Sequence, residues 1–173
     1  MGRGIVSSSV TARWYPVSKS LDPTSQPNYP SGFTHYRRVA SWPRLSGALK
    51  RLIQNEDEFD LLEGVEDRNS TAGFGDGFLT ISTPLGIVTR PKMRTVQAQN
   101  VAGSFQTQVS TTGMSSVIAR CTTSIATEVD AAFITDVFTN TSSQIRYASV
   151  AFSGSVTYNV LTTYGWIDKR GKP

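Results

Sequence analysis

Seven carboxylates gather between residues 56 and 67, and they are the side chains whose number and spacing best suit chemistry. They are Glu56, Asp57, Glu58, Asp60, Glu63, Glu66 and Asp67, with no basic residue among them. Two carboxylates can act together as general acid and base, and carboxylate oxygens can hold Ca²⁺. The spacing of Asp57, Asp60 and Glu63 lacks the alternating ligands and central glycine of an EF-hand loop. Such dense like charge predicts a solvated face, with cation binding or pairing to a neighbour's basic surface as alternatives.

The chain has one cysteine, Cys121, and one histidine, His35. A catalytic cysteine needs an activating base, and nothing in the spacing of these two residues predicts that they meet. A single cysteine also excludes an intrachain disulfide, which favours a reducing compartment. In a stretch rich in β-forming residues, Cys121 is expected to be a small buried hydrophobic side chain.

Three glycines surround Asp76 in the segment from residue 72 to residue 78. Their spacing fits neither the phosphate loop nor the dinucleotide fingerprint, because no lysine or helix follows them. A tight turn that leads into a strand is the expected structure. Since neither this segment nor the carboxylates nor Cys121 forms a recognisable catalytic arrangement, we expect a structural or binding protein, not an enzyme. No cofactor and no metal are expected.

Basic residues dominate the N-terminal third of the chain. Residues 1 to 55 hold eight of them against a single acid, Asp22. They are Arg3, Arg13, Lys19, Arg37, Arg38, Arg44, Lys50 and Arg51. Each Lys or Arg that neutralises a phosphate releases counterions and strengthens binding without reading sequence. These residues are candidates for nucleic-acid contact, and because their spacing is sparse, simple solvation is the alternative.

A second basic feature is the alternation of Arg90, Lys92 and Arg94. In an extended strand, a period of two points all three side chains toward the same face. Pro91 cannot donate to a ladder, which predicts a sheet edge or a loop for this segment. The three residues could face RNA, or they could keep a sheet edge from pairing with other chains.

Residues 1 to 43 are expected to form an extended arm. Prolines, glycines and serines punctuate the segment and leave it little periodicity. Large apolar and aromatic residues nevertheless recur, too many for a disordered linker. Such side chains serve as anchors that fill sockets on the same domain or on a neighbouring subunit. The aromatic residues expected at a subunit interface are Trp14, Tyr15, Tyr36 and Trp42.

Residues 44 to 55 are the best helix candidate. The apolar residues with the i, i+3, i+4 spacing of a helix are Leu45, Ala48, Leu49, Leu52 and Ile53. The macrodipole disfavours negative charge near a helix C-terminus, so the helix is expected to stop near Asn55, ahead of the acidic run.

From residue 77 onward the pattern favours strands. The candidates are 77–82, 86–90, 93–110, 115–126, 132–139, 144–153 and 155–167. The final segments alternate most clearly: Ala148 and Val150 share the parity expected to be buried, and Ser149 lies on the parity expected to be polar. Residues 128 to 138 also have helical spacing, so a short helix is an alternative there.

Composition agrees with one mainly β domain. At 173 residues the chain can bury a single core, and hydrophobic residues make up 38% against only 17% charged. The prediction is an antiparallel β-sandwich, jelly-roll-like in preference to immunoglobulin-like, with one helix in the N-terminal half and an extended N-terminal arm. The expected organisation is the arm, 1 to 43, followed by a β-sandwich domain, 44 to 173, that includes the helix.

In organisation the chain resembles the small jelly-roll coat proteins of non-enveloped RNA viruses. The resemblance rests on the basic N-terminal arm, the Ser/Thr-rich strands and the terminal strand pair at 145–152 and 154–160, although the chain lacks the dense Arg/Lys run of that family. It implies a capsid protein: a self-assembling subunit, present in many copies, that encloses nucleic acid. RNA would be held by non-specific phosphate contacts, with the protein in the virion and, during assembly, in the host cytoplasm.

A carbohydrate-binding or adhesive β-sandwich is the alternative function. It would use a flat aromatic platform drawn from Trp14, Trp42, Tyr158, Tyr164 and Trp166. Neither a run of 18 apolar residues nor the layout of a secretory signal is present, so no membrane partner is expected.

Overall fold

In the described part of the chain the regular secondary structure consists of β-strands, with no helix. A computed structural model describes residues 44–45, 48–100, 105–115, 119–123, 129–134, 136–151 and 155–168. All of these residues belong to one unit of the chain, Arg38–Pro173. The strands are β1 (Arg44–Leu45), β2 (Ala48–Leu49), β3 (Leu52–Asn55), β4 (Glu58–Asn69), β5 (Phe74–Thr80), β6 (Arg90–Gln99), β7 (Phe105–Ser110), β8 (Ala119–Thr123), β9 (Val129–Ile134), β10 (Gln144–Ala151) and β11 (Val156–Ile167).

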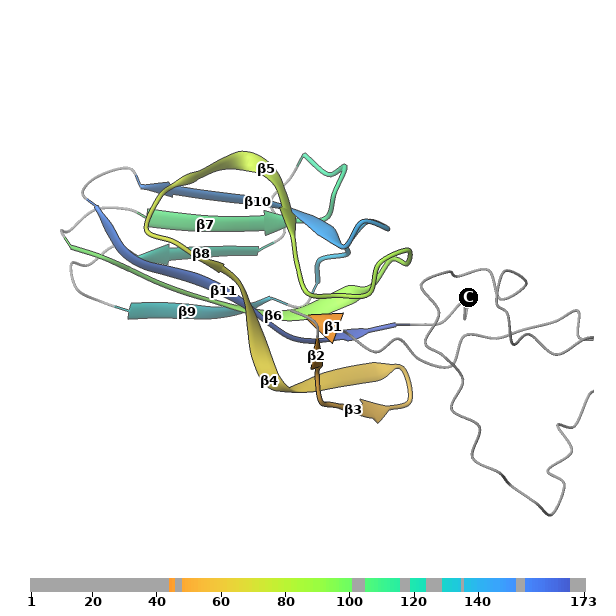
Figure 1. The fold of residues 1–173 in the computed structure, drawn as a ribbon. Coiled ribbons are helices and arrows are strands. Elements are labelled where there is room, and N and C mark those ends of the chain that lie inside the picture. The colour runs from red at the N-terminus through yellow and green to blue at the C-terminus, as the bar shows by residue number, and fades with distance from the viewer. Residues whose placement is uncertain are drawn as a thin grey trace, which may run out of the picture. The chain divides into compact units, whose positions relative to one another are not determined.

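The strands form two main antiparallel sheets (Figure 1). One has four strands in the order β5-β10-β7-β8, and the other has five in the order β3-β4-β11-β6-β9. β1 and β2 pair only with each other. The prediction of a mainly β protein with antiparallel pairing is therefore confirmed.

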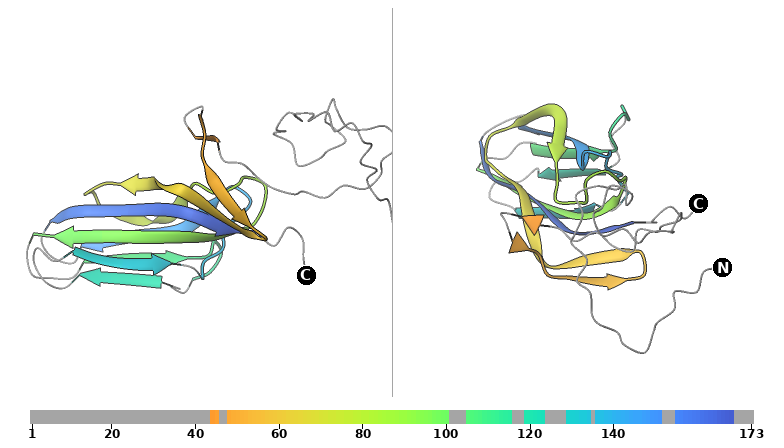
Figure 2. Two further views of the ribbon diagram at one scale, coloured as in Figure 1. Left: turned by 90° about the horizontal axis from the view of Figure 1, so that it is seen from below. Right: turned by 45° about the vertical axis from the view of Figure 1, so that its right-hand side comes forward.

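Strand pairing brings together segments that are far apart in sequence. β4 pairs with β11, β5 with β10, β6 with β9 and β7 with β8, all antiparallel. Two further pairings, β11 with β6 and β10 with β7, join these pairs into the two sheets. Figure 2 shows β4, β11 and β6 running side by side.

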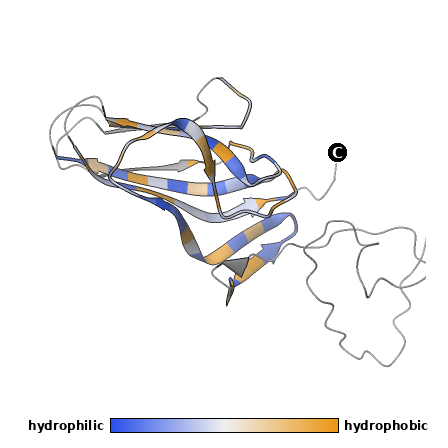
Figure 3. Cartoon of the chain, turned by 45° about the horizontal axis from the view of Figure 1, so that its top comes forward, coloured by the Kyte–Doolittle hydropathy of each residue, from blue (hydrophilic) through white to orange (hydrophobic). Residues whose placement is uncertain are grey.

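The two sheets share one apolar core. Hydrophobic and hydrophilic residues follow one another along the strands (Figure 3), so each sheet can turn its apolar side chains to the other. Met93 and Leu161 of the five-stranded sheet pack with Val109 and Tyr147 of the four-stranded sheet. The other buried members of this cluster are Ile81, Ile134, Val137 and Ile145.

A second, smaller apolar cluster packs β4 against β11 in the five-stranded sheet. Phe59 of β4 stacks on Trp166 of β11, with ring centroids 5.4 Å apart and an interplanar angle of 9°. Leu61 completes the buried set. Gly165 precedes the tryptophan with φ +157°, and a Cβ on it would lie 2.1 Å from the Phe59 carbonyl oxygen. Only glycine permits this approach of β11 to β4.

The helix predicted over residues 44 to 55 is wrong, because the described residues of this segment form β1, β2 and β3 and the link at 50–51. β3 pairs with β4 across a two-residue turn, in which Glu56 adopts φ 52°. Leu52 packs against the second cluster, while Ile53 is exposed on the opposite face. Hairpin pairing with β4 thus overrides a spacing that also fits a helix.

Several strand predictions also need correction. The segment 86–90 is mostly a turn and loop, because β6 begins only at Arg90. Where a short helix was considered, at 128–138, residues 129–134 form the strand β9. The range 93–110 is divided between β6 and β7. β4, a twelve-residue strand through the acidic run, was not anticipated.

β10 and β11 agree with the predicted segments 144–153 and 155–167, but the buried face of β10 is the opposite one. Ile145, Tyr147 and Ser149 are buried, and Val150 is exposed. Ser149 tolerates burial because its hydroxyl accepts a hydrogen bond from the backbone N–H of Phe74, at 3.0 Å.

Candidate functional site

The three alternating basic residues of β6 lie on one face of the five-stranded sheet, as their spacing predicts. Arg90, Lys92 and Arg94 are half-buried, and the intervening Pro91 and Met93 are buried on the core side. β6 as a whole is not an edge strand or a loop, because it lies between β11 and β9. In the described residues its pairing with β9 begins at Met93, so Pro91 is paired with β11 alone, as a proline allows.

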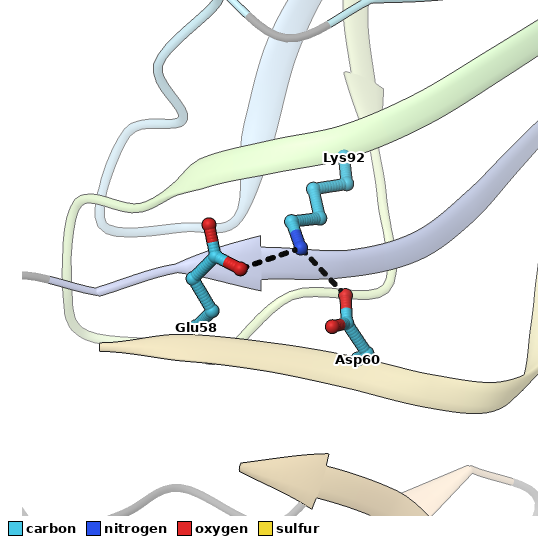
Figure 4. A network of polar contacts seen from close by, with 3 residues as sticks. All are labelled: Glu58, Asp60 and Lys92. Atoms are coloured by element: carbon cyan, nitrogen blue, oxygen red, sulfur yellow. Dashed lines mark hydrogen bonds and ion pairs between the residues drawn. The ribbon is translucent and has the colours of Figure 1, made fainter. Parts of the chain in front are cut away.

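Lys92 is the centre of a small ion-pair network (Figure 4). Its Nζ donates to Asp60 Oδ1 at 2.7 Å and to Glu58 Oε2 at 3.2 Å. Lys92 and Asp60 both lie opposite Gly165 of the intervening β11, so no side chain stands between them. Burial lowers the pKa of the Lys92 ammonium, but the hydrogen bonds to Asp60 and Glu58 outweigh burial and raise that pKa.

Arg90 also has a carboxylate partner. Its guanidinium forms an ion pair with Asp136, whose side chain is exposed. Together with the Lys92 network, this pair places three carboxylates beside the basic face of β6. The face therefore carries both signs of charge, which weakens its attraction for a polyanion.

The acidic run that suggested chemistry begins in the turn of Glu56 and Asp57 and continues along β4. Glu56, Glu63 and Glu66 are exposed, in keeping with the predicted solvated face. Glu58 and Asp60 instead hold Lys92. Among the residues that the structure describes, no group of three or more His, Cys, Asp or Glu is placed to hold a metal ion.

Asp67 is a partly buried carboxylate of the run, near the end of β4. It accepts a hydrogen bond from the Ser82 backbone N–H at 2.8 Å and one from the Thr163 hydroxyl at 2.5 Å. Burial raises the pKa of the Asp67 carboxyl, and the hydrogen bonds from Thr163 and Ser82 oppose this only in part. Asp67 thus connects β4, the loop after β5 and β11.

The three described aromatic residues among those proposed for a sugar-binding platform do not gather on one surface. Trp166 is fully buried against Phe59, so its predicted availability for stacking is wrong. Tyr158 and Tyr164 of β11 are partly exposed, at 42% and 37%, but six residues separate them, roughly 20 Å along a strand. The two other platform candidates, Trp14 and Trp42, lie outside the described residues.

All of the predicted nucleic-acid and interface residues of the arm lie outside the described residues. They are Arg3, Arg13, Lys19, Arg37, Arg38, Trp14, Tyr15, Tyr36 and Trp42. The single histidine, His35, lies outside them as well. Arg44 lies in β1 and Cys121 in β8. Immediately before β3, Lys50 is half-buried and Arg51 is exposed.

Sequence reasoning missed five exposed apolar residues, which lie in three loops and near the end of β5. We call this set the loop-end patch, and its members are Phe78, Leu85, Val88, Met114 and Phe138. The available signal was the position of Leu85, a large apolar residue between Pro84 and Gly86 in a turn, where polar residues are usual.

Hydrogen bonds fix the loops of this patch to one another. The Gly86 N–H donates to the Thr141 carbonyl at 2.7 Å, and the Thr139 N–H donates to the Thr89 carbonyl at 2.9 Å. The Phe138 N–H donates to the Thr111 hydroxyl at 2.9 Å. These contacts link the segments after β5, after β7 and before β10.

Arg146 of β10 joins the loop-end patch to β5. It lies opposite Phe78, donates through Nη1 to the Met114 carbonyl at 2.7 Å, and forms an ion pair with Asp76. The hydrogen bond from Arg146 lowers the pKa of the Asp76 carboxyl.

Comparisons with protein families, with curated proteins and with solved structures find no match to this chain. In the part that the structure describes, no helix has the length and apolar character needed to cross a membrane. The function is therefore argued from geometry and charge.

Proposed function

We propose that this chain is a coat subunit that assembles in many copies into a virion shell around nucleic acid. In this proposal the two sheets form a β-sandwich of the jelly-roll type, and the protein acts as a structural component without catalysis. Its place is the virion, and during assembly the host cytoplasm.

The strand order is the observation that carries the proposal. Taken in sequence, the eight strands from β4 to β11 pair first with last, second with second last, and so inward to the pair β7–β8. This nesting is what results when a long antiparallel ribbon is wound into two sheets. The orders β4-β11-β6-β9 and β5-β10-β7-β8 fit the eight strands and two Greek keys of a jelly roll.

Jelly rolls occur in viral capsids, lectins and cupins, so the fold alone does not decide between functions. Two features favour a coat subunit over a sugar-binding module. Trp166, a candidate for the aromatic platform, is buried in the core, whereas the apolar residues of the loop-end patch are exposed. Exposed apolar surface of this kind is typical of protein contacts.

The proposed nucleic-acid contact rests mainly on the basic N-terminal residues. Arg90 and Lys92 carry acidic partners within the domain, whereas Arg51 is exposed ahead of β3. Phosphate contacts made by such dispersed residues depend strongly on salt and do not read sequence. RNA is the nucleic acid that the resemblance favours.

The test is the particle size and nucleic-acid content of the purified full chain. Light scattering and negative-stain microscopy at low and high salt, with absorbance at 260 and 280 nm, are expected to find uniform closed particles that contain nucleic acid. A matched variant, Arg3→Gln with Arg13→Gln and Lys19→Gln, is expected to carry less nucleic acid at the same salt. A nucleic-acid-free monomer at both salt concentrations would overturn the proposal.

A further inference from the structure

We infer that the loop-end patch is the surface through which one copy of this chain contacts another. The inference rests on the proposed function and gives it a location: residues Phe78, Leu85, Val88, Met114 and Phe138 form the centre of a contact between copies. The partner is a second copy of this chain, and the contact is apolar at its centre and charged at its rim.

The size of the patch suits an interface. An aromatic side chain carries about 150–250 Å² of surface, so Phe78 and Phe138, exposed at 60% and 45%, leave roughly 200 Å² of apolar surface in solvent. With Leu85, Val88 and Met114 the total is on the order of 500 Å², the size of the largest apolar patch on a typical monomer, which is often functional. A standard interface buries about 800 Å² on each partner, so these residues would supply roughly 60% of one side.

The patch is already arranged before a partner binds. Two hydrogen bonds, Gly86 to Thr141 and Thr139 to Thr89, join the loop after β5 to the loop before β10. A third, from the Phe138 N–H to the Thr111 hydroxyl, joins the loop after β7 to them. Binding to a fixed surface costs less conformational entropy than binding to mobile loops. A rigid surface also repeats one geometry in every copy, as a symmetric assembly requires.

Charge at the rim selects the partner. The ion pairs Arg146–Asp76 and Arg90–Asp136 place two cations and two anions beside the patch, without net charge. A polyanion such as nucleic acid meets no excess of positive charge there. A second copy offers the same alternation of signs, so its rim can be complementary to this one.

The contact can be tested by placing a charge on the patch. Leu85→Asp and, separately, Phe138→Asp are prepared in the full chain, with Leu49→Asp as the matched control because Leu49 of β2 is similarly exposed, 59% against 70% for Leu85. Light scattering across a concentration series measures the concentration at which each protein assembles. Both patch variants are expected to need at least about tenfold more protein than the wild type, and the control an unchanged amount.

The outcomes separate this inference from the proposed function. If the wild type assembles and both patch variants assemble at its concentration with unchanged thermal melting, the inference is overturned while the coat function stands. If Phe138→Asp unfolds, the more exposed Leu85→Asp decides the question alone. A wild type that stays monomeric overturns the coat function and the inference together.

Discussion

The inter-sheet core and the loop-end patch are both built from large apolar residues, yet they lie in opposite environments. Met93, Val109 and Leu161 are buried between the two sheets, whereas Leu85 and Val88 stand in solvent. The core residues come from strands whose partners lie within the same chain. The patch residues come mainly from loops, and no described part of the chain buries them. Apolar character therefore serves folding in one region and, in our account, association in the other.

This comparison separates two kinds of mutation. Burying a large apolar side chain contributes about 1.5–3 kcal/mol, so truncation in the core should lower the free energy of unfolding. The same truncation in the loop-end patch should leave that free energy nearly unchanged and affect assembly instead. Within the core and its polar surroundings, the expected loss of stability is largest at Trp166 and smallest at Lys92.

The largest effect is expected from Trp166→Ala. The ring is fully buried and stacked on Phe59, so its loss should lower the free energy of unfolding by about 3–5 kcal/mol. Denaturant titration followed by circular dichroism measures the change. Leu85→Ala in the loop-end patch is the control, with an expected change within about 0.5 kcal/mol. Equal losses in the two variants would break the comparison.

A smaller effect is expected from Tyr147→Phe. The Tyr147 hydroxyl donates to Asn159 Oδ1 at 3.2 Å, and both residues are buried. Removing the donor leaves a buried acceptor without this bond, at a cost of about 1–3 kcal/mol. Tyr158→Phe, on an exposed ring, serves as the control in the same denaturant titration. A neutral Tyr147→Phe would show that the interaction adds nothing to the stability of the core.

Asp67→Asn tests a carboxylate whose pKa is raised by burial. Burial raises the folded-state pKa of Asp67, so the folded protein holds this proton more tightly than the unfolded chain does. Stability therefore falls as pH rises from the ordinary value of 3.8 through the raised pKa. Asparagine can still accept from the Ser82 N–H and carries no charge, so the variant should melt higher than the wild type at pH 7. The difference should vanish below pH 3.8, and a variant that melts lower at pH 7 would contradict the account.

The smallest effect is expected from Lys92→Gln. Glu58 and Asp60 are about half exposed, so water and salt screen the network, and its loss should cost about 0.5–1 kcal/mol. Thermal melting at low and high salt measures this cost, which should shrink as salt increases. A loss as large as that of Trp166→Ala would mean that the charged face of β6 acts as part of the core.

The sequence was most informative where local alternation agrees with long-range pairing. The segments of β10 and β11 were predicted, and so was the shared face of Arg90, Lys92 and Arg94. Sequence reasoning misjudged which side of β10 is buried because it treated Ser149 as a surface residue. A hydrogen bond to the Phe74 N–H makes burial of that serine acceptable.

Other features depend on contacts that no local pattern contains. The spacing of Leu52 and Ile53 fits a helix, and only pairing with β4 makes this segment a strand. β4 was not predicted because the dense negative charge of this segment outweighed the alternation of Phe59 and Leu61 with Glu58 and Asp60. The ion partners of Lys92 lie two strands away, so their identity required the register of β4, β11 and β6.

The most direct test of the central claim is electron cryo-microscopy of the purified full chain. Our account predicts closed particles in which neighbouring copies bury Leu85, Val88 and Phe138 against one another and the basic N-terminal residues face enclosed nucleic acid. Particles whose loop-end patch faces solvent would contradict the assigned contact. The presence of monomers alone, at concentrations and salt conditions that preserve the fold, would contradict the coat function itself.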